Sequence, residues 1–215
     1  MPKEAQGDAG LLFDRLRWRA ARGNDAGVRE ILVQPPKSLG RPEQWWNYQQ
    51  RAIRAAMEER SFKLAYRLAS STRQPPGSAY AEAEWLAGWL ALRFTGQPKL
   101  ASGHFQRLWS GVTTPISRAR AGYWAGRAVA ANGDRPAAAV WYRRAAAYSH
   151  TFYGQLAADE LGLARIERLQ PSPRHDTAAI DTLRRRPPAR IAALFCHAGE
   201  PGAAQPFFRH LGFEA

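Results

Sequence analysis

Apolar side chains recur three or four residues apart along most of the chain, which is the spacing of one face of an α-helix. Trp85 and Trp89 share such a face with Leu92. No segment alternates apolar and polar residues around an Asn-Gly or Asp-Gly turn, the pattern expected of a β-hairpin. The 40 alanines add the residue type with the highest helix propensity. The pattern therefore predicts an all-α protein.

Glycine and proline divide the chain into segments of ordinary helix length. Gly96-Gln97-Pro98 places Gly just past one predicted helix and Pro in the first turn of the next. Thr114-Pro115 and Gly133-Asp134-Arg135-Pro136 are likewise expected to mark the start of a new helix. Softer breaks are expected at 23–25, 34–36, 74–77 and 170–173. A further helix pair is predicted over residues 45–57 and 62–69.

Two parts of the chain repeat one arrangement of small and aromatic residues. Each has a Gly on one predicted helix, then an Ala on the next and an aromatic residue four positions further on. The two sets are Gly88, Ala101, Phe105, Leu108 and Gly126, Ala138, Tyr142, Ala145. Their spacing of about 37 residues is typical of helix-turn-helix solenoids of the tetratricopeptide kind. We expect a right-handed superhelix of such pairs rather than a compact bundle.

Most aromatic residues in this pattern are expected to pack between helices, because the small residues let neighbouring helices approach closely. The predicted packing residues are Trp85, Gly88, Trp89, Phe105, Trp124, Gly126, Trp141, Tyr142 and Tyr153. Another possibility is that a minority of the aromatic side chains line a concave surface and stack on sugar rings. The sequence does not sort one group from the other.

The composition adds a strong positive charge. The chain has 215 residues, with 31 Lys and Arg against 18 Asp and Glu, a net charge of +13. Of these cations 27 are Arg, which favours bidentate recognition of carboxylate or phosphate. The arginines are dispersed along the chain, so we expect no specific nucleic-acid binding. The longest apolar run, residues 85–92, is far too short to span a membrane.

The sequence contains no recognisable catalytic, metal or cofactor motif. The five histidines are scattered, and Glu82 and Glu84 are expected on nearly opposite sides of a helix. The single Cys196 excludes an intrachain disulfide and is predicted to be a buried structural thiol. We therefore predict no catalytic residues, no metal site and no cofactor.

Several stretches resemble the α-superhelical region of soluble lytic murein transglycosylases of Gram-negative bacteria. They are GSAYAEAEWLAGWLALRFTGQP (77–98), HFQRLWSGVTTPISRARAGYWAGRAVAANGD (104–134) and AAAVWYRRAAAYSHTFYGQLAADELG (137–162), with RAIRAAMEERSFKLAYRLAS (51–70) upstream. The ordered cluster TPIS, YWAGRA, WYRRAA and TFYGQLA is specific to this resemblance. We predict a superhelical domain over residues 11–215, preceded by a disordered segment or linker at 1–10. The resemblance covers most of this domain and is strongest over 77–162.

The family cleaves peptidoglycan between N-acetylmuramic acid and N-acetylglucosamine, forming a 1,6-anhydromuramoyl end. A Glu in a Glu-Ser motif of a lysozyme-like domain does this work, and no Glu in this chain is followed by Ser. The resemblance thus implies the non-catalytic superhelical portion, which holds glycan strands for a catalytic domain that is absent here. It also implies a periplasmic location, although the chain shows no signal peptide.

The resemblance gives the arginines a possible partner. Peptidoglycan stem peptides carry carboxylates, and we hypothesise that some of five arginines face a groove that binds them. The five are Arg118, Arg120, Arg127, Arg143 and Arg144. Cell-wall proteins are further possible partners. The alternative function is a helical-repeat scaffold that docks a partner peptide in its concavity.

Overall fold

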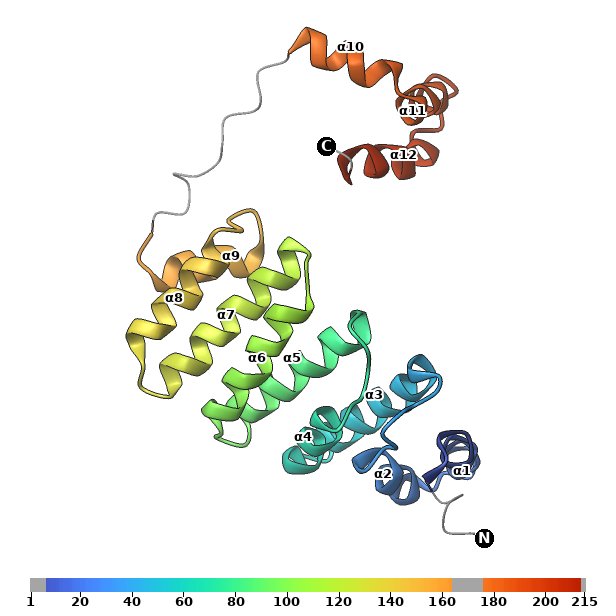
Figure 1. Cartoon of the computed structure of the whole chain (residues 1–215), viewed down its shortest axis with the longest axis vertical. Coiled ribbons are helices and arrows are strands. Elements are labelled where there is room, and N and C mark those ends of the chain that lie inside the picture. Colours follow the sequence, from blue (N-terminus) through green and yellow to red (C-terminus); the bar gives the residue numbers. More distant parts are fainter. Residues whose placement is uncertain (1–6, 164–175, 214–215) are drawn as a thin grey trace. The chain divides into compact units, whose positions relative to one another are not determined.

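The computed structural model describes residues 7–163 and 176–213, and within them the regular secondary structure is entirely α-helical. The prediction of an all-α protein is confirmed (Figure 1). The helices are α1 (Ala9–Ala21), α2 (Asp25–Val33), α3 (Pro42–Glu58), α4 (Phe62–Ser70), α5 (Ser78–Arg93), α6 (Pro98–Gly111), α7 (Pro115–Ala131), α8 (Arg135–Ala146), α9 (Phe152–Glu160), α10 (Thr177–Arg185), α11 (Pro187–His197) and α12 (Pro201–Phe213).

The chain divides into two compact units, Met1–Arg168 and Leu169–Ala215. The sequence predicted a single domain over residues 11–215, without this division. Helix α1 begins at Ala9 because the Asp8 side chain accepts a hydrogen bond from the Leu11 backbone N–H at 2.8 Å. Residues 9 and 10 are therefore helical, although they belong to the segment predicted as a disordered region or linker. The predicted break at 170–173 lies outside the described residues.

The predicted helix ends have clear physical causes. Gly96 adopts a φ of +63°, a left-handed conformation that favours glycine and ends α5, and Pro98 then opens α6. The Thr114 hydroxyl caps α7 by accepting from the Ser117 backbone N–H at 3.4 Å, and Asp134 caps α8 by accepting from the Ala137 N–H at 2.9 Å. These local signals set the length of each helix before any packing.

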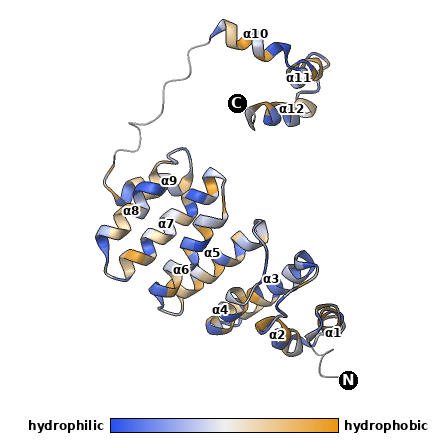
Figure 2. Cartoon of the chain, in the orientation of Figure 1, coloured by the Kyte–Doolittle hydropathy of each residue, from blue (hydrophilic) through white to orange (hydrophobic). Residues whose placement is uncertain are grey.

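In the first unit each helix packs against the next one along the chain, and α7 also contacts both α5 and α9. Figure 1 shows α5 to α8 lying side by side with alternating direction. The buried apolar residues fall into three clusters, contributed mainly by α1–α5, by α5–α7 and by α7–α9. Figure 2 shows apolar and polar residues sharing the same helices, as expected when one face of a helix packs inward.

The repeated glycines are points of close helix contact. A Cβ placed on Gly88 would lie 2.7 Å from Cε1 of Phe105, and one on Gly126 would lie 2.5 Å from Cε1 of Tyr142. In each repeat, the aromatic ring of the second helix therefore rests against the backbone of the first. This contact gives the shared spacing of the two repeats a physical meaning.

The second unit consists of α10, α11 and α12, and α11 packs against both of the others. Its buried residues include Ala192, Ala204 and Leu211, and Phe195 stacks on Phe207 with ring centroids 5.8 Å apart. The prediction that Cys196 is buried is wrong, since the residue is exposed. Three short helices leave much of α11 uncovered, so a thiol near its end remains in contact with solvent.

Candidate functional site

Three tryptophans on α5 and α7 form the centre of an aromatic surface. The rings of Trp85 and Trp89, one helical turn apart, stack with centroids 5.7 Å apart and an angle of 12° between their planes. Trp124 meets Trp85 edge-on at 6.4 Å. The indole nitrogens of Trp85 and Trp124 are buried and have no hydrogen-bond partner among the described residues. All three rings remain partly exposed, so they belong both to the packing and to the surface.

Arg120 of α7 covers one edge of this aromatic surface. Its guanidinium carbon lies 5.2 Å above the centre of the Trp85 ring, at a distance suited to a cation–π interaction. The same guanidinium approaches the Glu82 carboxylate at 4.0 Å. The Arg120 side chain is 25% exposed, so part of it faces solvent.

Arg127, two turns further along α7, has a comparable setting. It donates a hydrogen bond to the Tyr123 hydroxyl at 2.8 Å and lies 3.8 Å from the Glu160 carboxylate of α9. The hydrogen bond to Tyr123, opposed by burial, raises the pKa of Arg127 above its ordinary value. Burial, together with the charge of Glu160, raises the pKa of the neighbouring Tyr142 to about 12. Arg127 is a permanent cation and Tyr142 a neutral phenol near neutral pH.

We call this set the aromatic–arginine row. It comprises Trp85, Trp89, Arg120, Tyr123, Trp124 and Arg127. Its members come from α5 and α7, and Tyr153 of α9 continues it by packing 5.6 Å from Tyr123. The row places the buried ring of Tyr123 and three partly exposed indole rings beside two cations that each have an acidic neighbour.

The other predicted arginines do not join this row. Arg118 lies 4.8 Å above the ring of Trp109 on α6, and Arg144 lies 4.6 Å above that of Trp141 on α8. The two tryptophans meet edge-on at 5.7 Å, so these arginines flank a second aromatic cluster. Arg143 is exposed in the last turn of α8, where a cation favours the helix dipole. The structure thus separates five arginines that the sequence treated as one group.

The remaining predicted packing residues have direct aromatic contacts. Phe105 stacks on Trp124 with centroids 6.0 Å apart, and Tyr142 lies 6.1 Å from Tyr123. Trp141 contacts Trp109. Gly88 and Gly126 provide the close approaches described above.

Sequence reasoning missed a polar network between α4, α5 and α6. His104, 6% exposed, has Nδ1 2.8 Å from Oε2 of Glu84 and Nε2 3.2 Å from the Tyr66 hydroxyl. Nη2 of Arg107 lies 2.7 Å from the same Nδ1, and its Nε donates to the Glu84 carboxylate at 3.2 Å. Nδ1 of His104 therefore faces both Glu84 and Arg107, and Nε2 faces the Tyr66 hydroxyl.

Ionised Glu84 is stabilised in this network. Burial acts to raise the pKa of Glu84, but the hydrogen bonds and positive charge of His104 and Arg107 together lower it below its ordinary value. Burial raises the pKa of Tyr66, which favours its neutral phenol. The partners of His104 are a carboxylate, a phenol and a guanidinium, and the set links α4, α5 and α6.

The described residues contain neither a metal-binding cluster nor a membrane-spanning helix. Within 7–163 and 176–213, no group of three or more His, Cys, Asp or Glu side chains is placed to hold a metal ion. None of the helices described there is both long enough and apolar enough to cross a lipid bilayer.

Comparisons with known proteins give no match: no family model, curated protein or solved structure is similar to this chain at a significant level.

Proposed function

We propose that the chain is the non-catalytic superhelical portion of a peptidoglycan lytic transglycosylase and holds glycan strands in the periplasm for cleavage by a separate catalytic domain. The sequential packing of α1 to α9 supports the finer proposal that the first unit is a section of a right-handed, tetratricopeptide-like solenoid. Cleavage with formation of the 1,6-anhydromuramoyl end belongs to that other domain.

The aromatic–arginine row is the observation that carries this proposal. Flat aromatic rings offer apolar surface to the C–H faces of sugars. Arg120 and Arg127 stand beside those rings with part of each side chain in solvent, and guanidinium groups pair bidentately with carboxylates. A glycan bearing short acidic peptides presents both features. A carboxylate that pairs with Arg120 would also compete with Glu82 for the same guanidinium.

The test is co-sedimentation of the full chain with purified sacculi. The double variant Arg120→Gln/Arg127→Gln removes both cations of the row without introducing negative charge. We expect its affinity for sacculi to fall by about tenfold, as for the loss of two partly exposed ion pairs, each worth up to about 1 kcal/mol. The matched variant Arg143→Gln/Arg144→Gln makes the same change in charge on α8, outside the row, and is expected to keep binding.

Circular dichroism and thermal unfolding of both variants verify that each is folded. A folded wild-type chain that does not sediment with sacculi would overturn the proposal. Equal loss in both double variants would show that only net charge matters, and would remove the row from the binding site.

One observation favours the alternative, a peptide-docking scaffold. The row carries acidic as well as basic groups, because Glu82 and Glu160 lie beside its two arginines. A partner peptide with both signs of charge would complement that pattern. If the row variants retain sacculus binding but lose binding to a cell-wall protein, the scaffold becomes the better function.

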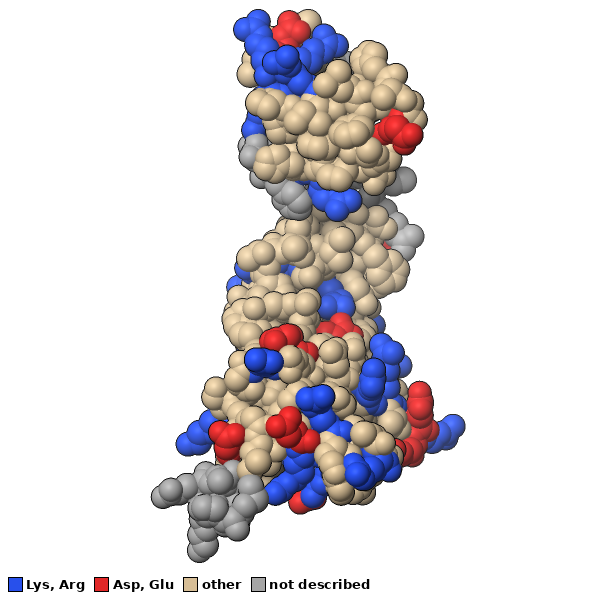
Figure 3. Space-filling view, turned by 90° about the vertical axis from the view of Figure 1, so that its right-hand side faces the viewer, with Lys and Arg blue, Asp and Glu red and all other residues tan. Residues whose placement is uncertain are grey.

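The charge distribution over the N-terminal helices disfavours a nucleic-acid function for that part of the chain. On the face drawn in Figure 3, Lys and Arg side chains are mixed with Asp and Glu over the N-terminal helices at the bottom of the view. Nucleic acid binding requires a continuous basic surface and gives a steep dependence on salt. A parallel titration with duplex DNA is expected to show only weak binding that disappears near physiological salt.

A further inference from the structure

A pocket lies between α1 and α3, away from the residues of the aromatic–arginine row. Phe13 of α1 packs against two residues of α3, with ring centroids 5.4 Å from Trp45 and 5.9 Å from Tyr48. Near the end of α1, the small side chains of Ala20 and Ala21 line the pocket. Aromatic packing therefore spaces the two helices, and small residues leave the space between them unfilled.

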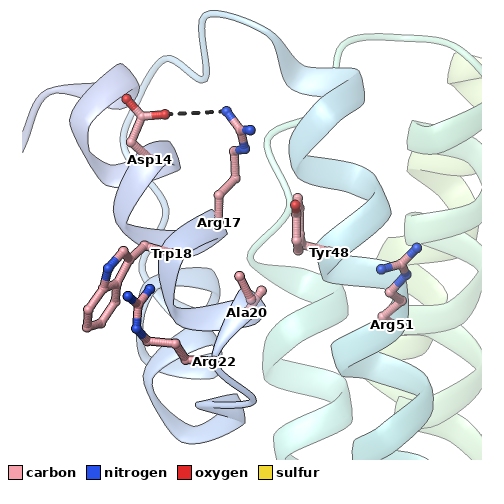
Figure 4. Close-up of a pocket in the computed structure, with 8 residues that line it drawn as sticks. Asp14, Arg17, Trp18, Ala20, Arg22, Tyr48 and Arg51 are labelled. Atoms are coloured by element: carbon pink, nitrogen blue, oxygen red, sulfur yellow. Dashed lines mark ion pairs between the residues drawn. The ribbon is translucent and has the colours of Figure 1, made fainter.

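The resulting pocket has a volume of about 570 Å³ and is open to solvent. Three of its lining side chains are arginines, namely Arg17 of α1, Arg22 directly after α1 and Arg51 of α3, against a single acidic residue, Asp14. Figure 4 shows Arg17 and Arg22 on one side of the pocket and Arg51 across it, beyond Tyr48. The lining carries a net charge of +2, that is, three arginines less one aspartate.

Arg17 and Arg51 form fewer hydrogen bonds and ion pairs within the fold than a neighbouring arginine does. Arg19 donates to the Gly27 carbonyl at 2.6 Å and to Glu30 at 2.9 Å, so its guanidinium is held inside the fold. Arg51, in contrast, is exposed and has no acidic partner within 4.0 Å among the described residues. Arg17 has one exposed partner, Asp14, at 3.7 Å. An external anion can therefore bind the guanidinium groups of Arg17 and Arg51 without disrupting contacts that stabilise the fold.

Trp18 gives a second, independent reason to regard this pocket as a binding site. Its side chain is 55% exposed, an unusual placement for a tryptophan that contributes little to the core. The guanidinium carbon of Arg22 lies 4.0 Å above the Trp18 ring. This stacking restricts the Arg22 side chain, so less conformational entropy is lost when its remaining donors bind a ligand.

The pocket continues along α3 in both directions. One neighbouring pocket shares Arg17 and Tyr48 and adds Arg41, and another shares Tyr48 and Arg51 and reaches α2. Through these shared residues the three pockets form a groove along α3, lined by several arginines and by the acidic residues Asp14 and Asp25. This shape suits an extended segment of chain better than a compact ion.

We propose that the groove between α1 and α3 binds an acidic peptide segment of a partner protein, whose Asp or Glu side chains pair with Arg17, Arg22 and Arg51. This goes beyond the glycan function, because it uses different helices and a different class of ligand. Clusters of arginine are the usual means of recognising acidic motifs. A nucleic acid is disfavoured, since its backbone needs a longer continuous basic track than one groove provides.

The test is fluorescence anisotropy with the full chain and a fluorescein-labelled hexaglutamate peptide. We expect saturable binding that weakens as salt rises, because the contacts are charged and exposed. Arg51→Glu is expected to reduce the affinity by about tenfold. Trp18→Ala is expected to reduce it by about threefold, because Arg22 loses its supporting ring.

Arg54→Glu is the matched control. Arg54 is exposed on the same helix, one turn from Arg51, and does not line the groove. Its variant has the same net charge as Arg51→Glu and is expected to weaken binding by less than about threefold. Trp18 and Arg51 are both exposed, so their variants are expected to remain folded.

Three outcomes would overturn the proposal. They are no binding of hexaglutamate to the wild-type chain, equal losses in Arg51→Glu and Arg54→Glu, and equal or tighter binding of a labelled hexathymidylate. The last would identify the groove as a nucleic-acid site instead. Sacculus binding by the row variants is measured separately, so failure of either proposal leaves the other intact.

Discussion

At the scale of single residues, Gly88 and Gly126 mark where neighbouring helices come closest. Each lies under an aromatic ring of the following helix. The ring is so close to the glycine backbone that an added Cβ atom would require the ring or the helix to move. Such contacts remove apolar ring surface from water while bringing two backbones together. Gly103 of α6 is different, because an added Cβ would meet only the Nη1 atom of Arg107, at 3.5 Å.

This contrast gives the first prediction. We expect Gly88→Ala and Gly126→Ala each to reduce the free energy of unfolding by about 1–3 kcal/mol through overpacking against the ring. Gly103→Ala is expected to leave it unchanged or raise it by up to about 1 kcal/mol, because alanine is the better helix former. Urea denaturation followed by circular dichroism measures all three. Similar values for Gly88→Ala and Gly103→Ala would contradict the close packing.

Glu84 carries the second prediction, which concerns pH. Its pKa in the folded chain is lower than the ordinary value of 4.5, so the ionised carboxylate stabilises the fold above that pH. This stabilisation is lost as the pH falls through the folded pKa. Near neutral pH, Glu84→Gln is expected to cost about 2 kcal/mol, as for a buried hydrogen bond to a charged group.

The measurement is the free energy of unfolding of wild type and Glu84→Gln from neutral pH downward. We expect the difference between the two proteins to be largest near neutral pH and to shrink below about pH 4.5. The exposed Glu58 provides the control, since Glu58→Gln makes the same chemical change at the end of α3. A difference that stays constant with pH would show that the charge of Glu84 is not stabilising.

At the scale of helices, the caps set the boundaries. Asp134 accepts a hydrogen bond from the Ala137 N–H at 2.9 Å and begins α8 directly after Gly133, whose φ is +90°. Glycine permits this turn, and the carboxylate satisfies one of the free backbone donors of the first helical turn. The same local device begins α2, where the Asn24 side chain accepts from the Gly27 N–H at 2.9 Å.

The third prediction tests the cap of α8. Asp134→Ala is expected to lower the free energy of unfolding by about 1 kcal/mol, because alanine cannot accept the hydrogen bond. Asp134→Asn is expected to change it by only a few tenths of a kcal/mol, since asparagine caps equally well. Thermal denaturation of the two variants distinguishes them. Equal destabilisation in both would mean that the carboxylate charge, rather than the cap, stabilises α8.

At the scale of the whole molecule, the first unit contains three apolar clusters arranged in order along the chain. In the solenoid that we propose for this unit, stability comes mainly from contacts between neighbouring elements, so a local defect is expected to have local effects. Leu32 belongs to the first cluster and is fully buried, whereas Leu108 belongs to the middle one.

The fourth prediction follows from that order. We expect Leu32→Ala to accelerate amide hydrogen exchange in α1 to α4 while leaving α8 and α9 close to wild type. Leu108→Ala, in the middle cluster, is expected to affect helices on both sides of it. Exchange measured by mass spectrometry resolves the difference. A uniform increase across α1 to α9 in Leu32→Ala would indicate one cooperative core instead of a solenoid.

The sequence by itself determined the helices and many of their ends. Alanine content, the spacing of Trp85, Trp89 and Leu92, and the Gly and Pro signals at 96–98 all act within a few residues of the chain. Local interactions of this range are readable without knowing the fold. The repeated Gly and aromatic positions were also visible, because their spacing is fixed by helix geometry.

Only the tertiary structure decided which side chains meet. Glu84 and His104 lie on successive helices, and nothing in their spacing distinguishes them from other scattered polar residues. The five predicted arginines were close in sequence, yet rotation about the helix axes distributes them over different surfaces. Cys196 was expected inside, but its three-helix unit is too small to cover it. The groove between α1 and α3 arises because Phe13 spaces two helices at one point, a packing outcome that periodicity alone cannot specify.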